Sequence, residues 1–190
     1  MEKKIKNSSS LQPRPDKVSN ELETCLNAAG IGYWKLNLYS LTAERSILHD
    51  QIFGYSSLLP VWTFDVFIKH VHPSDRKKVK GLLQASFQNK KSVEFECRIY
   101  RADNKQLRWI WVSGQFIIAD QSTYMSGLVQ DITQRKEAEC RLKESEMRWQ
   151  YALEGANQGV WDWYPPEKII YFSHTWKCML GYKDNEIGNK

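Results

Sequence analysis

The residues that could carry out chemistry are few and lie far apart. Four cysteines occur, Cys25, Cys97, Cys140 and Cys178, without a C-x-x-C pair and without clustered histidines. A structural zinc site needs four thiolate or imidazole ligands at close spacings. The sequence therefore predicts isolated, reduced thiols and no metal site.

Motifs of the common catalytic sites are missing as well. The sequence has no Gly-rich phosphate loop, no G-x-S-x-G and no H-E-x-x-H. One catalytic alternative is an isomerase whose base is a buried carboxylate such as Asp65. That chemistry needs a carboxyl group with a raised pKa and a donor for the oxyanion, and no pattern indicates either. We therefore predict that this part of the protein is not an enzyme.

The net charge of +5 raises nucleic-acid binding as an alternative. Part of this charge lies in Arg76–Lys80 and in Lys90-Lys91. The first run alternates with core positions of an expected helix, and Asp and Glu are spread throughout the chain. A solvated helix face is the favoured interpretation, so no nucleic-acid partner is predicted.

The sequence gives no sign of a membrane segment or a signal peptide. No apolar run approaches the roughly 18 residues that cross a bilayer. Lys3, Lys4 and Lys6 precede no apolar stretch, which a signal peptide would require. We expect a cytoplasmic protein without membrane contact in this part. Residues 1–20 are polar, basic and interrupted by prolines, which predicts a disordered tail.

Hydrophobic periodicity predicts an α+β order behind this tail. The expected elements are two short strands in residues 32–46, a helical turn in 49–55, helices in 62–71 and 72–91, and strands in 92–102, 106–118 and 123–132. Gly54 would end the helical turn, and Pro73 suits the first turn of the longer helix. Tight turns are expected at Asn104, which tolerates positive φ, and at Asp120-Gln121.

The sequence repeats itself at an offset of 127 residues. The paired residues are Leu26 with Leu153, Ala29 with Ala156, Gly32 with Gly159, Trp34 with Trp161, Ser46 with Ser173, and Gly54-Tyr55 with Gly181-Tyr182. The register holds without a gap, which indicates two copies of one domain. The first copy is whole, and we expect the second to be truncated after about forty residues.

The first copy resembles a PAS domain of the subtype that has an Arg-Trp strand. The resemblance is carried by HPSDR (His72–Arg76), FECRIYRADNKQLRWIWVSGQ (Phe95–Gln115) and GLVQDITQRKEAE (Gly127–Glu139), which is similar to the Asp-Ile-Thr ending of the family. ALEGANQGVWDW and YFSHTWKCMLGY resemble the opening of the next domain in a tandem bacterial-type sensor. The resemblance implies a five-stranded antiparallel sheet with short helices on one face, followed by a connector helix.

The resemblance also sets the expected domain boundaries. Residues 1–20 are the tail and residues 21–133 a complete PAS domain. Residues 134–152 are the connector helix, and residues 153–190 begin a second, truncated PAS domain. The pocket of the complete domain is expected to be lined by Trp34, Phe53, Phe67, Phe95 and Cys97.

Neither of two familiar PAS cofactors is predicted. Flavin-binding members of the family carry an Asn-Cys-Arg motif, whereas Cys97 stands in Glu-Cys-Arg. Haem needs an axial ligand, and His70 and His72 are the candidates. His72 precedes Pro73 in a motif that the family uses structurally. An unidentified small ligand is the remaining expectation.

The segment that leaves the last strand is expected to transmit a signal. Its residues are Asp131, Ile132, Thr133 and Gln134. Asp131 or Thr133 would cap the connector helix, with Gln134 completing a capping box. Along the helix, a heptad seam is formed by Ala138, Leu142, Ser145, Trp149 and Ala152. The seam predicts a parallel homodimer, and the alternative is a helix docked on its own domain.

These observations predict a sensory input module. It would bind a small ligand or a partner and pass the change through the connector helix to an output domain. By resemblance that output would be a histidine kinase, or a cyclic-dinucleotide cyclase or phosphodiesterase. The alternative is a ligand-free PAS adaptor for dimerisation and protein interaction.

Overall fold

The computed structural model describes residues 15–119, 122–156 and 158–188. The chain divides into two compact units, residues 1–134 and residues 135–190.

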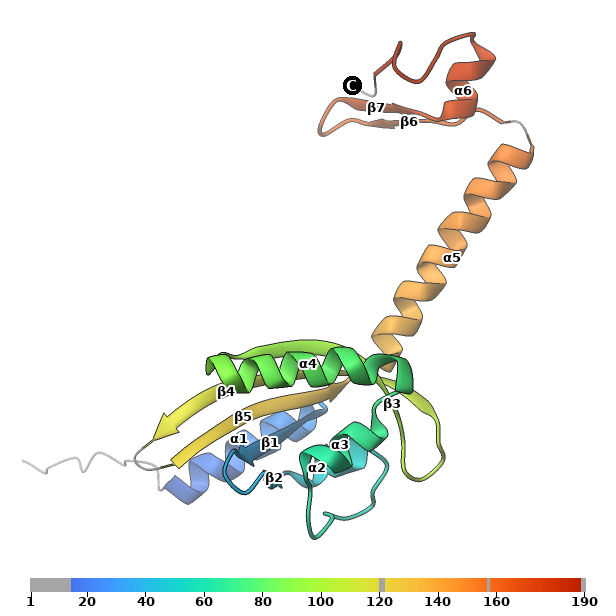
Figure 1. Ribbon diagram of the computed structural model, residues 1–190. Coiled ribbons are helices and arrows are strands. Elements are labelled where there is room, and N and C mark those ends of the chain that lie inside the picture. Colours follow the sequence, from blue (N-terminus) through green and yellow to red (C-terminus); the bar gives the residue numbers. More distant parts are fainter. Residues whose placement is uncertain (1–14, 120–121, 157, 189–190) are drawn as a thin grey trace, which may run out of the picture. The chain divides into compact units, whose positions relative to one another are not determined.

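The first unit is built on one antiparallel sheet, in the order β2-β1-β5-β4-β3 (Figure 1). Its strands are β1 (Ile31–Asn37), β2 (Ala43–Arg45), β3 (Val93–Tyr100), β4 (Leu107–Ala119) and β5 (Ser122–Asp131). The first long strand of the unit therefore lies beside the last one, with Trp34 opposite Gly127. The expected five-stranded antiparallel sheet is confirmed.

The helices begin where side chains can satisfy their free backbone amides. They are α1 (Pro15–Ala28), α2 (Ile47–Ile52), α3 (Phe64–His70) and α4 (Pro73–Asn89). Ser46 caps α2 and Thr63 caps α3, and in α4 the first position is taken by Pro73, which needs no amide partner. Figure 1 shows α2, α3 and α4 on the same side of the sheet.

The core lies between these three helices and the sheet. Strand β3 shows the expected alternation, with Val93, Phe95, Cys97 and Ile99 buried and their neighbours more exposed. The opposite face of the sheet carries α1, whose Leu22 and Leu26 lie beside Tyr33 and Leu128 along one groove.

Three local expectations differ from the structure or fall outside it. The left-handed residue of the turn before β4 is Lys105, with φ of 58°, and not Asn104. Asn104 instead accepts a hydrogen bond from the amide of Gln106 at 2.9 Å, which fixes the turn through its side chain. Residues 15–20 of the predicted tail are helical in α1. Residues 1–14 and the turn at Asp120-Gln121 lie outside the described residues.

The second unit contains a helix, a two-stranded sheet and a short helix. These are α5 (Thr133–Gly155, whose first two residues belong to the first unit), β6 (Trp161–Tyr164), β7 (Ile169–Phe172) and α6 (His174–Met179). The connector helix is thus longer than the expected residues 134–152. Aromatic side chains of the hairpin are exposed, among them Trp161 and Trp163.

The sequence repeat is accompanied by equivalent hydrogen bonds in the two units. In the first unit the hydroxyl of Ser46 accepts from the amides of Tyr33 at 3.1 Å and His49 at 3.2 Å. In the second unit the hydroxyl of Ser173 accepts from the amides of Val160 at 2.9 Å and Trp176 at 3.2 Å. Each partner in the second set stands 127 residues after its counterpart in the first. The repeated serine therefore joins a strand to a short helix in the same way in both units.

A repeated glycine allows the strand and the helix to approach this closely. A Cβ atom on Gly32 would lie 2.7 Å from the backbone of His49, and one on Gly159 would lie 2.6 Å from the backbone of Trp176. Backbone cannot move aside as the end of a side chain can, so both sites require glycine.

We predict that Gly32→Ala lowers the free energy of unfolding by about 1–3 kcal/mol, because the added methyl group overpacks a backbone contact. The matched control is Gly81→Ala in α4, where a Cβ atom meets nothing within 4 Å. That substitution should raise the free energy of unfolding by about 0.5–1 kcal/mol, since alanine favours the helix. Urea unfolding of the three proteins tests both signs. Equal effects of the two substitutions would contradict the close approach.

Candidate ligand-binding site

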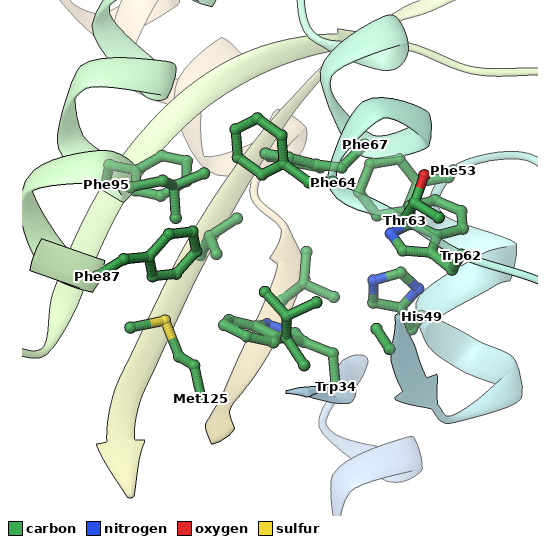
Figure 2. Close-up of a pocket in the computed structure, with 15 residues that line it drawn as sticks. Trp34, His49, Phe53, Trp62, Thr63, Phe64, Phe67, Phe87, Phe95 and Met125 are labelled. Atoms are coloured by element: carbon green, nitrogen blue, oxygen red, sulfur yellow. The ribbon is translucent and has the colours of Figure 1, made fainter. Parts of the chain in front are cut away.

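A cavity of about 70 Å³ lies between the sheet and the helices of the first unit. Its lining is mainly apolar and comes from helices α2, α3 and α4, from the loops beside them and from all five strands (Figure 2). The lining residues are Trp34, Leu36, Ala43, His49, Phe53, Trp62, Thr63, Phe64, Phe67, Leu83, Phe87, Phe95, Val112, Met125 and Val129. The space exceeds that of a single water molecule several times, since a water needs only about 10–15 Å³ by such a measure.

Four of the five predicted pocket residues line this cavity, namely Trp34, Phe53, Phe67 and Phe95. Cys97 does not. Phe95 and Val112, which pair across strands β3 and β4, line the cavity. Two residues further along β3, the pair of Cys97 and Ile110 does not line the cavity and is part of the packed core. Alternation in a strand assigns Phe95 and Cys97 to one face but cannot show where along that face the packing opens.

Burial also makes Cys97 chemically inert. Removal from water raises the pKa of its thiol to about 12. The three other cysteines are exposed, and none of the four is among the residues that line the cavity.

Several lining residues were missed by sequence reasoning. Phe64 and Phe87 stand in helices whose apolar periodicity is a signal of core-facing residues. His49 and Trp62 carried no such signal, because His49 lies in the polar run His-Asp-Gln of a short helix and Trp62 precedes α3 in a loop. Their roles depend on contacts between segments distant in the sequence.

Two glycines on neighbouring strands make room for Trp34. A Cβ atom on Gly127 would lie 2.5 Å from the indole, and one on Gly114 would lie 2.7 Å from it. The indole Nε1 of Trp34 donates to the carbonyl of Leu128 at 3.2 Å. The indole thus rests on the central strands with its one polar atom satisfied.

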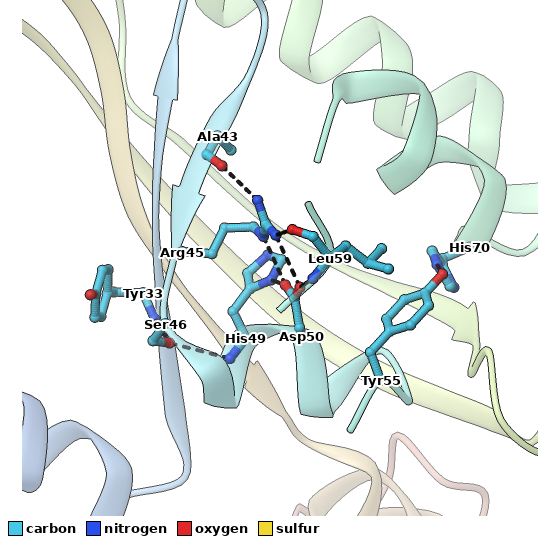
Figure 3. Close-up of polar contacts among 9 residues, drawn as sticks. All are labelled: Tyr33, Ala43, Arg45, Ser46, His49, Asp50, Tyr55, Leu59 and His70. Atoms are coloured by element: carbon cyan, nitrogen blue, oxygen red, sulfur yellow. Dashed lines mark hydrogen bonds and ion pairs between the residues drawn. The ribbon is translucent and has the colours of Figure 1, made fainter. Parts of the chain in front are cut away.

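A buried carboxylate anchors the other side of the cavity (Figure 3). Oδ1 of Asp50 accepts from Nε of Arg45 and from Nδ1 of His49, each at 2.8 Å. Its Oδ2 accepts from Nη2 of Arg45 at 3.0 Å and from the amide of Leu59 at 2.8 Å. Arg45 also donates to the carbonyls of Ala43 and Leu59. The carboxylate therefore has its full set of four donors.

These bonds determine the charge of Asp50 and His49. Burial opposes ionisation of Asp50, but the hydrogen bonds from His49, Arg45 and the Leu59 amide outweigh it and hold the pKa of Asp50 well below its usual range. Burial lowers the pKa of His49 and outweighs the opposing hydrogen bond to Asp50. Asp50 is thus an anion, and His49 is neutral at pH 7.

His70 has a structural role next to the cavity. Its Nδ1 lies 2.9 Å from the carbonyl of Tyr100 and its Nε2 lies 3.0 Å from the hydroxyl of Tyr55. Nδ1 must donate to the carbonyl, so Nε2 accepts from the hydroxyl. Both ring nitrogens are therefore occupied, which does not fit the axial haem ligand weighed from the sequence. His72 accepts a hydrogen bond from the amide of Ser74 at the start of α4.

The expected transfer segment is fixed to the sheet by hydrogen bonds. Oδ1 of Asp131 accepts from the amide of Thr133 at 2.9 Å. The hydroxyl of Thr133 accepts from the amide of Trp109 at 2.9 Å, and the amide of Ile132 donates to the carbonyl of Trp109. Thr133 therefore binds strand β4 and does not cap its own helix. Gln134 is exposed.

The predicted seam residues all lie on α5 and are exposed. They are Ala138, Leu142, Ser145, Trp149 and Ala152. The side chains of Leu142 and Trp149 are 63% and 67% exposed, respectively. An exposed leucine and tryptophan seven residues apart form an apolar stripe along this helix.

Comparison with known proteins agrees with this fold. Residues 48–129 match the family model of the PAS fold. A sensory box histidine kinase/response regulator from Burkholderia thailandensis superimposes with a TM-score of 0.56 at 25% identity, covering 68% of this chain and 98% of that structure. The N-terminal domain of a diguanylate cyclase with a PAS/PAC sensor, from Marinobacter aquaeolei, gives a TM-score of 0.51 at 16% identity, covering 56% and 98%, and shows the fold alone.

A curated protein is similar to this chain in amino-acid sequence. A blue-light-activated histidine kinase from Brucella anthropi is 30% identical over 123 residues, which are 64% of this chain and 24% of the relative. The first unit thus has the PAS fold. These relatives support a general sensory role for it.

Two further observations concern the described residues only. Within them, no group of three or more His, Cys, Asp or Glu side chains could hold a metal ion. No helix among them is long and apolar enough to cross a membrane.

The neutral imidazoles predict a pH dependence of stability. His49 and His70 have folded-state pKa values lowered by burial, so below the unfolded value of about 6.5 the unfolded chain binds more protons. The free energy of unfolding should therefore fall as the pH drops from about 7.5 to 5.5, by at most about 1.4 kcal/mol per pH unit for each imidazole. Carboxylates contribute only nearer their own values of about 4.

Urea unfolding at several pH values measures this slope, and His49→Gln should make it shallower. A free energy of unfolding that is constant from pH 7.5 to 5.5 would contradict the assignment of both imidazoles as neutral.

Proposed function

We propose that the first unit is a sensory input domain that binds a small ligand in its cavity and passes the change to helix α5. The observation that carries this proposal is the position of Trp34. Its indole lines the cavity and lies against Gly127 of β5. Strand β5 in turn ends at Asp131, two residues before α5 begins at Thr133.

The path from cavity to helix is short and made of rigid contacts. A ligand that shifts the Trp34 indole would push the indole against the backbone of β5, because a Cβ atom at Gly127 would already overlap the indole. Movement of β5 relative to β4 acts on Thr133, whose hydroxyl accepts from the amide of Trp109. The four residues Asp131 to Gln134 are therefore proposed as the transfer segment.

We propose that α5 is a connector that pairs with α5 of a second copy of the chain. The exposed stripe of Leu142 and Trp149 has the seven-residue spacing of a coiled-coil seam. A shift or rotation of paired helices would carry the signal onward. A helix that docks its stripe on its own domain is the alternative.

The second unit is proposed to be the opening of a second PAS domain. Its Ser173 bonds, its Gly159 approach and the positive φ of Gly181 repeat those of Ser46, Gly32 and Gly54. The proposed domains are therefore residues 21–133 and 153–190, with the connector between them.

The output of the whole protein is a further proposal. The chain spans 24% of the length of the curated relative. The relatives are named histidine kinases and a diguanylate cyclase. A histidine kinase or a cyclic-dinucleotide enzyme is therefore the output domain that we propose. A ligand-free adaptor is the second candidate, favoured by the exposed stripe on α5.

Native mass spectrometry distinguishes a ligand sensor from an adaptor. We expect the purified chain to carry a small molecule that denaturation releases, because an apolar cavity of this kind gains by being filled. Its absorption spectrum should show only the Trp and Tyr band. A visible flavin or haem band would contradict the cofactor prediction, and a mass equal to that of the bare chain would favour the adaptor.

The dimer proposal makes a separate prediction. Leu142→Asp places a charge in the proposed seam, and an unpaired charge loses its hydration when buried, so the dimer should dissociate to monomers. The matched control is Met147→Asp, which makes a similar change on α5 at a position outside the seam. Light scattering reports the mass, and a mass unchanged by Leu142→Asp would refute the seam.

A further inference from the structure

One polar atom in the wall of the cavity has no partner in the protein. The side chain of His49 is 5% exposed, and its Nδ1 is held by Asp50 at 2.8 Å. Figure 2 shows the ring of His49 edge-on to the cavity, with one nitrogen directed toward Trp34. Among the residues that the structure describes, none hydrogen-bonds to this second nitrogen, Nε2.

The network behind His49 decides what Nε2 can do. An ionised carboxylate only accepts hydrogen bonds, and Asp50 is ionised because Arg45 and the Leu59 amide complete its coordination. Nδ1 of His49 must therefore carry the ring proton. In a neutral imidazole the other nitrogen then has a lone pair. Nε2 of His49 is consequently a hydrogen-bond acceptor facing an apolar space.

The rest of the lining limits the charge and size of what can bind. The lining contains no Lys, Arg, Asp or Glu among its described residues, so a charged ligand would lose its hydration without compensation. The volume of about 70 Å³ lies between the roughly 10–15 Å³ that holds one water and the roughly 150 Å³ of an apolar cavity that binds benzene. The aromatic walls favour a flat molecule.

We infer that the cavity takes an uncharged, flat molecule of about one small ring that donates an N–H or O–H hydrogen bond to Nε2 of His49. This inference rests on the proposed function and specifies the chemical class of its ligand. It also assigns His49 as the residue that selects the ligand, with Asp50 and Arg45 as positioning residues that fix the ring and its tautomer.

Three five-membered rings test the donor requirement with the full chain. Pyrrole has an N–H group, whereas furan and thiophene are rings of similar size without one. Binding is followed by the shifts of the indole N–H signals of Trp34 and Trp62 in two-dimensional NMR. We expect pyrrole to bind at least about tenfold more tightly than furan or thiophene, because only pyrrole donates a hydrogen bond to the acceptor that faces the cavity.

The pH dependence gives a second test that needs no substitution. The charged and titratable groups around the imidazole are Asp50 on the same helix, Arg45 on β2 and His70 on α3. Burial lowers the pKa of His49, so its ring takes up a proton at Nε2 only at a pH below the usual imidazole range, and pyrrole then loses its acceptor. Its affinity should therefore decrease, whereas the affinity of thiophene should change less.

His49→Phe removes the acceptor and keeps an aromatic ring, so the preference for pyrrole should disappear. If this variant does not fold, the pH dependence of the wild-type chain decides alone. Equal binding of all three rings would overturn the inference about His49 and leave the cavity as a ligand site. Failure of all three rings to shift the Trp34 signal, in chain refolded after denaturation has released any bound molecule, would overturn both the inference and the proposed ligand-binding function.

Discussion

A buried carboxylate must have all its hydrogen bonds satisfied, and Asp50 imposes this requirement on the first unit. Its four donors come from a strand, a short helix and a loop, through Arg45, His49 and Leu59. Loss of any donor would leave part of a charge unpaired in the interior, which costs far more than an exposed ion pair yields. The strand β2, the helix α2 and the loop before α3 are therefore held in one arrangement. That arrangement presents His49 to the cavity with a defined tautomer.

The cavity is held open on its other side by a different kind of contact. The Trp34 indole occupies space left by Gly114 and Gly127, and a methyl group at Gly127 would meet both the indole and the backbone of Ser113. Such tight packing would transmit a displacement of the indole to the neighbouring strands, because no free space separates them. The polar anchor and the packed indole thus have separate tasks. In the function that we propose, the polar anchor would define which molecule the cavity binds, and the packed indole would connect the cavity to the strand that leads into α5.

The sequence predicted the elements of the fold better than it predicted the site. Strand alternation in Val93 to Tyr100 is a local signal, and the structure confirms it. Phe95 and Cys97 share one face, but only the packing of α3 and α4 over that face decides that the cavity lies beside Phe95. His49 has no local signal of function. Its role follows from Arg45, Asp50 and Leu59, whose meeting depends on the fold. The turn residue was misassigned because the side chain of Asn104, rather than its own φ, shapes that turn.

Comparison of the two units separates the residues that shape the backbone from those that define the chemistry. The serine cap and the close-approach glycine are repeated in both units with the same hydrogen bonds and contacts. The position of Asp50 is not repeated, because Lys177 stands there in the second unit. Lys177 is also buried, and its Nζ donates to the carbonyl of Asp184 at 3.2 Å. An anion that orients a histidine in one unit is thus replaced by a cation that binds a backbone carbonyl in the other. The residue at position 49 changes with it, from histidine to Trp176, which has no lone pair to offer. The shared backbone therefore holds two different sets of buried polar groups, and the recognition that we propose for the first unit would depend on its unrepeated residues.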